Sequence, residues 1–172
     1  MSLDRPADLR IIVMGVSGCG KSTVAQGIAR ALGGRFFDGD DFHPRQNIEK
    51  MSRGEPLDDL DRWPWLTLVG EELERGEGIV VGACSALKRR YRDHIAAAAG
   101  AQVLFLHLSG SRSLIAERMA VREGHFMPPA LLESQFTALE PPDQHENAIT
   151  VDIQPTISEI VVEAVRALKA RL

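Results

Sequence analysis

The feature that most constrains the fold is a glycine-rich loop that lies between a short apolar run and a helical segment. The apolar run covers residues 11–14, and the next residues, Gly15 to Ser22, read Gly-Val-Ser-Gly-Cys-Gly-Lys-Ser. Apolar residues then recur with helical spacing up to Leu32, and Gly33-Gly34 ends that pattern. The spacing G-x-x-x-x-G-K-S between a strand and a helix predicts a loop whose backbone N–H groups surround phosphate oxygens.

We assign the whole loop to nucleotide binding, with the positive end of the following helix dipole adding to the attraction. Lys21 would reach the β- and γ-phosphates and act in catalysis, and the Ser22 hydroxyl would bind Mg²⁺. The predicted nucleotide contacts of this segment are Gly15, Val16, Ser17, Gly18, Cys19, Gly20, Lys21, Ser22 and Thr23.

The rest of the chain alternates short apolar runs with helical stretches. The runs lie at residues 35–37, 79–81, 103–106 and 149–151, and the helical stretches at 66–74, 87–99, 112–122 and 158–172. This alternation predicts a three-layer α/β fold with a five-stranded parallel sheet flanked by helices, in one domain over residues 1–172. Two polar, turn-rich segments interrupt the pattern, and we interpret them as a substrate-binding insertion at about 41–64 and a lid at about 118–142.

Composition excludes several classes of function. A net charge of −4 argues against a nucleic-acid-binding protein that works by bulk electrostatics. Cys19 and Cys84 form neither a zinc pattern nor a disulfide framework, which favours a reducing cytoplasm. The polar N-terminus is unlike a signal peptide, and no apolar run approaches the ~20 residues of a membrane span. Cys19 is either a reactive thiol beside the helix N-terminus or a buried and inert one.

Two carboxylates follow the second predicted strand in the sequence Asp38-Gly39-Asp40. They should lie beside the first strand and its loop, facing the γ-phosphate. A kinase needs a carboxylate that accepts the proton of the acceptor hydroxyl, and often a second one near the metal. We assign Asp40 as the base and Asp38 as its helper, both of them in contact with the acceptor, and we place Asp40 with Ser22 at the metal. The alternative is that either aspartate only caps the next segment.

From this turn onward the sequence resembles the gluconate kinase family, within the shikimate-kinase-like and nucleotide-kinase-like group of phosphate-loop kinases. The resemblance rests on three stretches, which are residues 38–66 with Asp38-Gly39-Asp40-x-x-His43-Pro44, residues 83–93 with Ser85-Ala86-Leu87-Lys88-Arg89, and residues 118–140 with His125-Phe126-Met127 and Ser134-Gln135-Phe136. It implies ATP and Mg²⁺ as cofactors, phosphorylation of D-gluconate to 6-phosphogluconate, and a homodimer.

Basic residues near these stretches are candidates for the acidic substrate and for ATP. Lys88 and Arg92 share a helix face by their i,i+4 spacing, and a guanidinium offers paired donors to a carboxylate. We therefore assign Lys88 and Arg92 to the substrate, with His43, Arg45 and Arg53 on its other side. The alternative for a charge run is a solvated face.

Two further arginines, one helical turn apart, lie at the start of the predicted lid. Because such kinases close an arginine-bearing lid over ATP, we assign Arg122 to the phosphates, as a catalytic residue, and Arg118 to packing on adenine. The segment from Asp152 to Pro155 is either an adenine wall or an ordinary turn.

Two other functions stay open at the level of sequence. One is a kinase for another small acceptor, such as shikimate or a nucleoside monophosphate. The other is a regulatory nucleotide-binding ATPase module, against which the acidic turn and the basic cluster argue.

Overall fold

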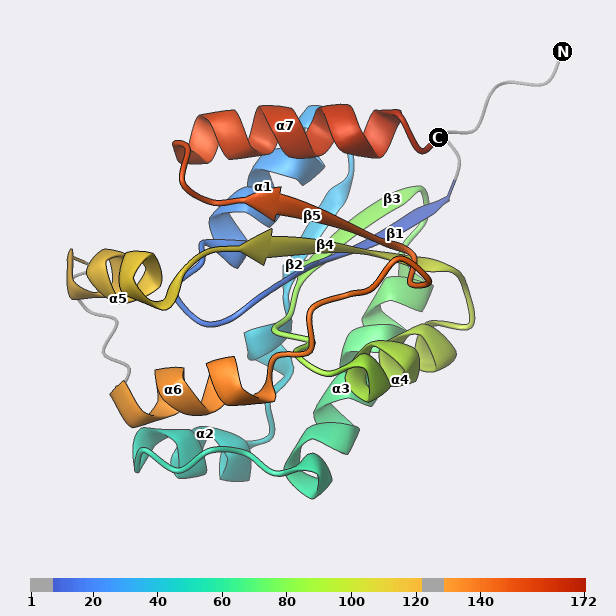
Figure 1. Ribbon diagram of the computed structural model, residues 1–172. Coiled ribbons are helices and arrows are strands. Elements are labelled where there is room, and N and C mark those ends of the chain that lie inside the picture. The colour runs from blue at the N-terminus through green and yellow to red at the C-terminus, as the bar shows by residue number, and fades with distance from the viewer. Residues whose placement is uncertain (1–7, 122–128) are drawn as a thin grey trace, which may run out of the picture.

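The computed structural model describes residues 8–121 and 129–172, which form a five-stranded sheet in the order β2-β3-β1-β4-β5 (Figure 1). All neighbouring strands pair in parallel. The strands are β1 (Leu9–Met14), β2 (Arg35–Asp38), β3 (Ile79–Ala83), β4 (Val103–Ser109) and β5 (Ala148–Asp152). The predicted three-layer α/β fold with five parallel strands is confirmed.

Helices cover both faces of the sheet, and shorter ones surround the carboxyl ends of its strands (Figure 1). They are α1 (Lys21–Leu32), η1 (Gly39–Phe42, a 3-10 turn), α2 (Arg45–Ser52), α3 (Asp59–Arg75), α4 (Arg89–Ala99), α5 (Arg112–Val121), α6 (Pro129–Ala138) and α7 (Ile157–Lys169). Helices α1 and α7 pack on one face, and α3 and α4 pack on the other. None of the helices within the described ranges is long and apolar enough to cross a membrane.

The central strand β1 shows why its sequence is apolar at every position. Ile11 and Val13 belong to the core beneath α1 and α7, while Ile12 and Met14 belong to the core beneath α3 and α4. Successive side chains of a strand point to opposite faces, so a strand covered on both sides needs apolar residues throughout.

The structure supplies the order of the strands, which the sequence left open. β3 lies between β1 and β2, so the acidic turn does not follow a strand adjacent to β1. The carboxyl ends of parallel strands nevertheless share one edge, and the turn reaches the glycine-rich loop from one strand further away.

The two segments expected to be irregular contain more helix than predicted. α3 begins at Asp59 because the Asp58 side chain accepts from the Asp61 N–H while the Asp61 side chain accepts from the Asp58 N–H, a reciprocal cap that the sequence analysis missed. Within the predicted lid, α6 occupies residues 129–138. Both helices face the end of the sheet where the loop after β1 lies, and they contribute walls to the site.

Candidate active site

The loop between β1 and α1 has the conformation that its glycines predict. Gly18 has a φ of 82°, in the left-handed region that favours glycine. The Gly15 N–H donates to the Ser85 carbonyl, 3.2 Å away beyond the end of β3, which fixes the start of the loop. Lys21 Nζ turns back and donates to the Val16 carbonyl at 3.1 Å. The ammonium group therefore lies beside the loop backbone, where this type of loop binds phosphates.

The acidic turn meets the start of α1 directly. Ser22 Oγ donates to Asp38 Oδ2 at 2.7 Å, and the Asp40 N–H donates to Asp38 Oδ1 at 2.9 Å. A serine hydroxyl and a carboxylate this close are the hard oxygen donors that Mg²⁺ prefers, so these residues fit the ion. Asp38 has both carboxylate oxygens engaged, and the Asp40 side chain faces the space beside Lys21.

The main chain of the acidic turn is held in place by contacts with α3 and with the end of β3. Trp65 of α3 donates its indole N–H to the Gly39 carbonyl at 2.7 Å, and this contact is buried. A Cβ at position 39 would lie 2.5 Å from the Ala83 carbonyl oxygen, so only glycine fits between the two aspartates. The Asp40 side chain is 81% exposed, but desolvation by the surrounding turn raises the pKa of its carboxyl group. Lys21 lowers this pKa, and the neighbouring Asp38 and Asp41 raise it. A raised pKa suits a group that must accept a proton.

His43 lies against the same turn as a neutral ring. It stacks on Trp65 with the ring centroids 4.0 Å apart, and its Nε2 is 3.7 Å from Asp40 Oδ1. The fully buried Asn47 donates through Nδ2 to the Asp61 carbonyl at 2.9 Å and lies 3.4 Å from His43 Nδ1. Burial, and next the positive charge of Arg62, lower the pKa of His43 to about 4, while Asp38 acts in the opposite direction.

These groups converge on a cavity of about 240 Å³. Lys21 and Asp40 lie on its phosphate side, and apolar side chains of α2, α3 and α6 form much of the rest. The lining residues are Ser17, Lys21, Asp40, His43, Ile48, Met51, Pro56, Leu57, Arg62, Trp65, Ser85, Leu131, Ser134 and Gln135. The cavity places an acceptor beside both the phosphate-binding lysine and a carboxylate.

A second cavity, of about 370 Å³, opens on the other side of the glycine-rich loop. Arg118 of α5 lies there and donates through Nη2 to the Gln154 carbonyl at 3.3 Å. The lining residues are Gly18, Cys19, Gly20, Thr23, Arg118, Pro155, Thr156 and Ile157. The predicted Arg118 and Pro155 therefore lie together at one opening beside the loop.

Comparison with known proteins decides the family. Residues 11–142 match a family model described as an AAA domain. A probable gluconokinase of Xenopus tropicalis is 44% identical over 170 residues, covering 89% of this chain and 90% of that protein. A gluconokinase of Gluconobacter oxydans is 44% identical over 164 residues, covering 93% and 91%. The chain belongs to the gluconokinase family.

Solved structures agree with this membership in the gluconokinase family. The crystal structure of a gluconokinase from Sinorhizobium meliloti superposes with a TM-score of 0.89 at 48% identity, covering 96% of this chain and 94% of that one. A shikimate kinase of Aquifex aeolicus has a TM-score of 0.62 at 17% identity, which shows the shared fold alone. The resemblance found in the sequence is confirmed, and the protein is a kinase.

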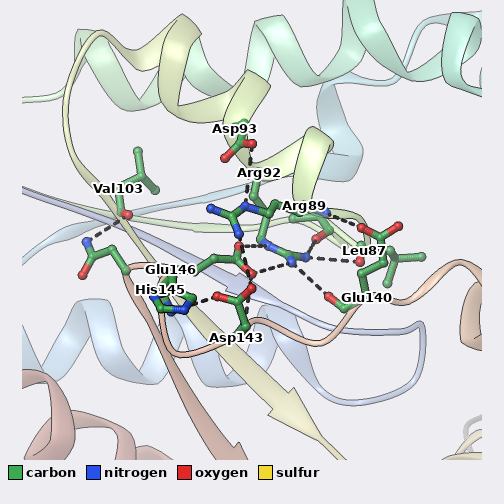
Figure 2. Close-up of polar contacts among 11 residues, drawn as sticks. Leu87, Arg89, Arg92, Asp93, Val103, Glu140, Asp143, His145 and Glu146 are labelled. Atoms are coloured by element: carbon green, nitrogen blue, oxygen red, sulfur yellow. Dashed lines mark hydrogen bonds and ion pairs between the residues drawn. The ribbon is translucent and has the colours of Figure 1, made fainter.

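Within this member of the gluconokinase family, Arg92 is a structural residue (Figure 2). Its side chain is only 1% exposed and forms a two-point ion pair with Glu146, at 2.7 and 3.0 Å. It also donates to the carbonyls of Ala86, Leu87 and Glu140, at 2.8, 3.2 and 2.9 Å. This corrects the assignment of Arg92 to the substrate, because its guanidinium is enclosed and already engaged on all sides.

Three other basic residues assigned to the substrate are not among the residues that line the acceptor cavity. Arg45 is 92% exposed and pairs with Glu49 one turn along α2, while Arg53 pairs with Glu55. Lys88 lies just before α4, with its ammonium 5.9 Å from the centre of the Tyr91 ring. Lys88 has an extended backbone at the N-cap of α4, so the predicted shared helix face of Lys88 and Arg92 is wrong, and only Arg92 lies on the helix.

The sequence analysis missed the arginine that does line the cavity. Arg62 of α3 lies 5.2 Å from the centre of the Tyr91 ring, and it donates to the Leu57 carbonyl. The sequence contains an indication of this position. Arg62 and Trp65 are three residues apart, so they share one face of a helix, and both line the cavity.

Gln135 belongs to one of the stretches that carry the family resemblance, without a predicted role of its own, and its side chain lines the cavity. The predicted Arg122 and the histidine at position 125 lie outside the described residues. The Cys19 side chain is buried, with 1% of its surface exposed.

Proposed function

We propose that this chain transfers the γ-phosphoryl group of ATP to D-gluconate and forms 6-phospho-D-gluconate. The observation that carries the proposal is the shared cavity of Lys21 and Asp40, in a chain that is 44% identical to proteins named gluconokinase. A cavity beside the phosphate-binding loop is what an acceptor requires, whereas a nucleotide-dependent switch has no need of one.

The residues supply each part of an in-line transfer. Asp40 accepts the proton of the attacking hydroxyl as the new bond between its oxygen and the γ-phosphorus forms and the bond to the β-phosphate oxygen breaks. Lys21 stabilises the negative charge on the phosphates, and the N–H groups of the loop hold them, except that of Ser17, which donates to Gln135. Ser22 and Asp38, in place of the predicted pair Ser22 and Asp40, would hold Mg²⁺, because the Ser22 hydroxyl contacts Asp38. The ion would offset the negative charge of the phosphates.

Arg62 is the residue that we propose for the carboxylate of the acceptor. Among the described residues of the cavity wall, the charged cations are Lys21 and Arg62, since burial keeps His43 neutral. Because Lys21 is assigned to the phosphates, Arg62 is the cation that can bind the carboxylate of the acceptor. On the nucleotide side, Arg118 and Pro155 are proposed to border the adenine ring, with Thr23 and Cys19 below it.

Location and assembly follow from the family resemblance. We propose a cytoplasmic enzyme that works as a homodimer, with residues 1–172 as one kinase domain. Mass photometry at nanomolar concentration tests the oligomeric state.

The decisive experiment measures ADP release with each of three acceptors. We expect ADP formation that requires Mg²⁺ and gluconate, with little release when water is the only acceptor. Shikimate tests the alternative hydroxy acid, and D-glucitol, which carries a hydroxymethyl group in place of the carboxylate, tests recognition of the acid. Equal ADP release with and without gluconate would refute the proposal.

A variant tests the role of Arg62 separately. Arg62→Met should raise the KM for gluconate by about 10- to 100-fold, as expected for a lost hydrogen bond to a charged group of roughly 1.5–3 kcal/mol. The KM for ATP should change little. Arg75→Met, on the exposed face of the same helix, is the matched control and should behave as the wild type. Equal changes in both KM values would place Arg62 outside acceptor recognition.

A further inference from the structure

One hydrogen bond joins the phosphate-binding loop to the opposite wall of the acceptor cavity. The backbone N–H of Ser17 donates to Gln135 Oε1 of α6 at 2.6 Å, across 118 positions of sequence. Both residues line the cavity that contains Lys21 and Asp40. Gln135 therefore stands where the phosphate cradle meets the acceptor space.

The bond also fixes which way the amide of Gln135 faces. A backbone N–H can only donate, so the atom facing Ser17 must be the carbonyl oxygen Oε1. The amide nitrogen Nε2, a donor of two hydrogen bonds, then faces away from Ser17. The Gln135 side chain shares this cavity wall with Lys21 and Asp40, so a donor there is available to a group that enters between the loop and the acceptor space.

The helix that carries Gln135 is anchored on both of its sides. Leu131 is buried, and Leu132 and Phe136 pack against the core beneath α1 and α7. Just beyond the end of α6, the Glu140 N–H donates to the Leu87 carbonyl at 2.8 Å, and its carbonyl accepts from Arg92 (Figure 2). Arg92 thus fixes the chain at Glu140, five residues after Gln135, which contacts the phosphate-binding loop.

A donor held rigidly in this way is effective where negative charge develops, because no reorganisation is needed at the moment of reaction. In phosphoryl transfer that charge lies on the equatorial oxygens of the transferring group. We propose that Gln135 is a catalytic residue, whose amide nitrogen donates to an oxygen of the transferring phosphoryl group while Ser17 holds the amide carbonyl. The proposal rests on the proposed kinase function and adds a residue to it.

Two substitutions distinguish the role of the Gln135 amide nitrogen as a donor from the role of its carbonyl oxygen in binding the Ser17 N–H. Gln135→Met keeps the length of the side chain and removes both polar atoms. Gln135→Glu keeps an oxygen for the Ser17 N–H and replaces the donor with a second oxygen, which would repel the phosphates. We expect both variants to lose kcat by about 10²- to 10³-fold, with the KM for gluconate within a few-fold of the wild type. Thr137→Ala, exposed on the same helix, is the control and should keep wild-type kcat.

A binding measurement gives a readout that a structural role would not move. The affinity for MgADP with aluminium fluoride and gluconate, which imitates the transferring group, should fall in both variants, while the affinity for Mg·ATP alone should not. Wild-type kcat in Gln135→Glu with a loss in Gln135→Met would show that the residue only ties α6 to the loop. A raised KM for gluconate with unchanged kcat would also overturn the proposal. If the wild type and Thr137→Ala show no gluconate-dependent ADP, the proposed function itself fails, whatever Gln135 does.

Discussion

At the scale of single residues, Asp38 and Asp40 have different surroundings that suit them to different roles. Asp38 accepts from Ser22 and from the Asp40 backbone, so its orientation is set by the start of α1. Asp40 lines the acceptor cavity, and partial desolvation there raises the pKa of its carboxyl group. The first aspartate is thus suited to hold a metal in place, and the second to take a proton.

Substitution by asparagine should distinguish these two roles. We expect Asp40→Asn to reduce kcat by about 10²- to 10⁴-fold with little change in the KM for gluconate, because an amide can bond the hydroxyl but cannot accept its proton. Asp38→Asn should instead raise the Mg²⁺ concentration needed for half-maximal rate. Steady-state kinetics over a Mg²⁺ series measures both effects. A larger loss of kcat in Asp38→Asn at saturating Mg²⁺ would reverse the assignment.

At the scale of elements, the buried ion pair of Arg92 and Glu146 connects segments that are far apart in sequence. It joins α4 to the stretch before β5, and the further bonds of Arg92 include the loop after β3 and the segment after α6. The Glu146 carboxyl group keeps a lowered pKa despite its burial, because Arg92 and the Asp143 N–H both bond to it. Neither residue of the pair is among those that line the acceptor cavity, and the pair connects segments next to its walls.

Removing Arg92 should therefore affect stability before it affects substrate binding. We expect Arg92→Ala to lower the free energy of unfolding by about 3–5 kcal/mol, because it leaves the Glu146 carboxylate buried without a partner. Chemical denaturation measures this loss. The control is Arg89→Ala, whose ion pair with Asp143 is half exposed and should contribute at most about 1 kcal/mol. Unchanged stability together with a raised KM for gluconate would return Arg92 to the acceptor site.

At the scale of the whole molecule, the sequence predicts best what is continuous along the chain. The loop from Gly15 to Ser22 and the turn around Asp40 are local patterns with a chemical meaning, so their places could be foreseen. The strand order could not, because nothing local decides that β3 lies between β1 and β2.

The cavity walls were harder to predict for the same reason. The contact between Ser17 and Gln135 spans 118 positions, and the partner that buries Arg92 lies 54 positions away. From charge patterns alone, Arg92 was predicted to bind the substrate, and Arg62 was not identified as a residue of the site. Tertiary contacts decide which charged side chains of an amphipathic helix become buried.

The last prediction concerns the coupling between nucleotide binding and the stability of the whole fold. A ligand that binds only the folded protein stabilises it by about 2.7 kcal/mol at 100 times its Kd, which for a chain of this length raises Tm by roughly 5–10 °C. Mg·ATP should produce such a shift in the wild type, measured by differential scanning fluorimetry. Lys21→Ala should have nearly the same Tm as the wild type without ligand, because the hydrogen bond of the lysine to the Val16 carbonyl is only partly buried. Its Mg·ATP shift should be largely lost, and its turnover abolished. Mg²⁺ alone and ATP with a chelator are the controls. A lowered Tm of the ligand-free variant would make Lys21 a structural residue, and a full Mg·ATP shift would separate the lysine from nucleotide binding.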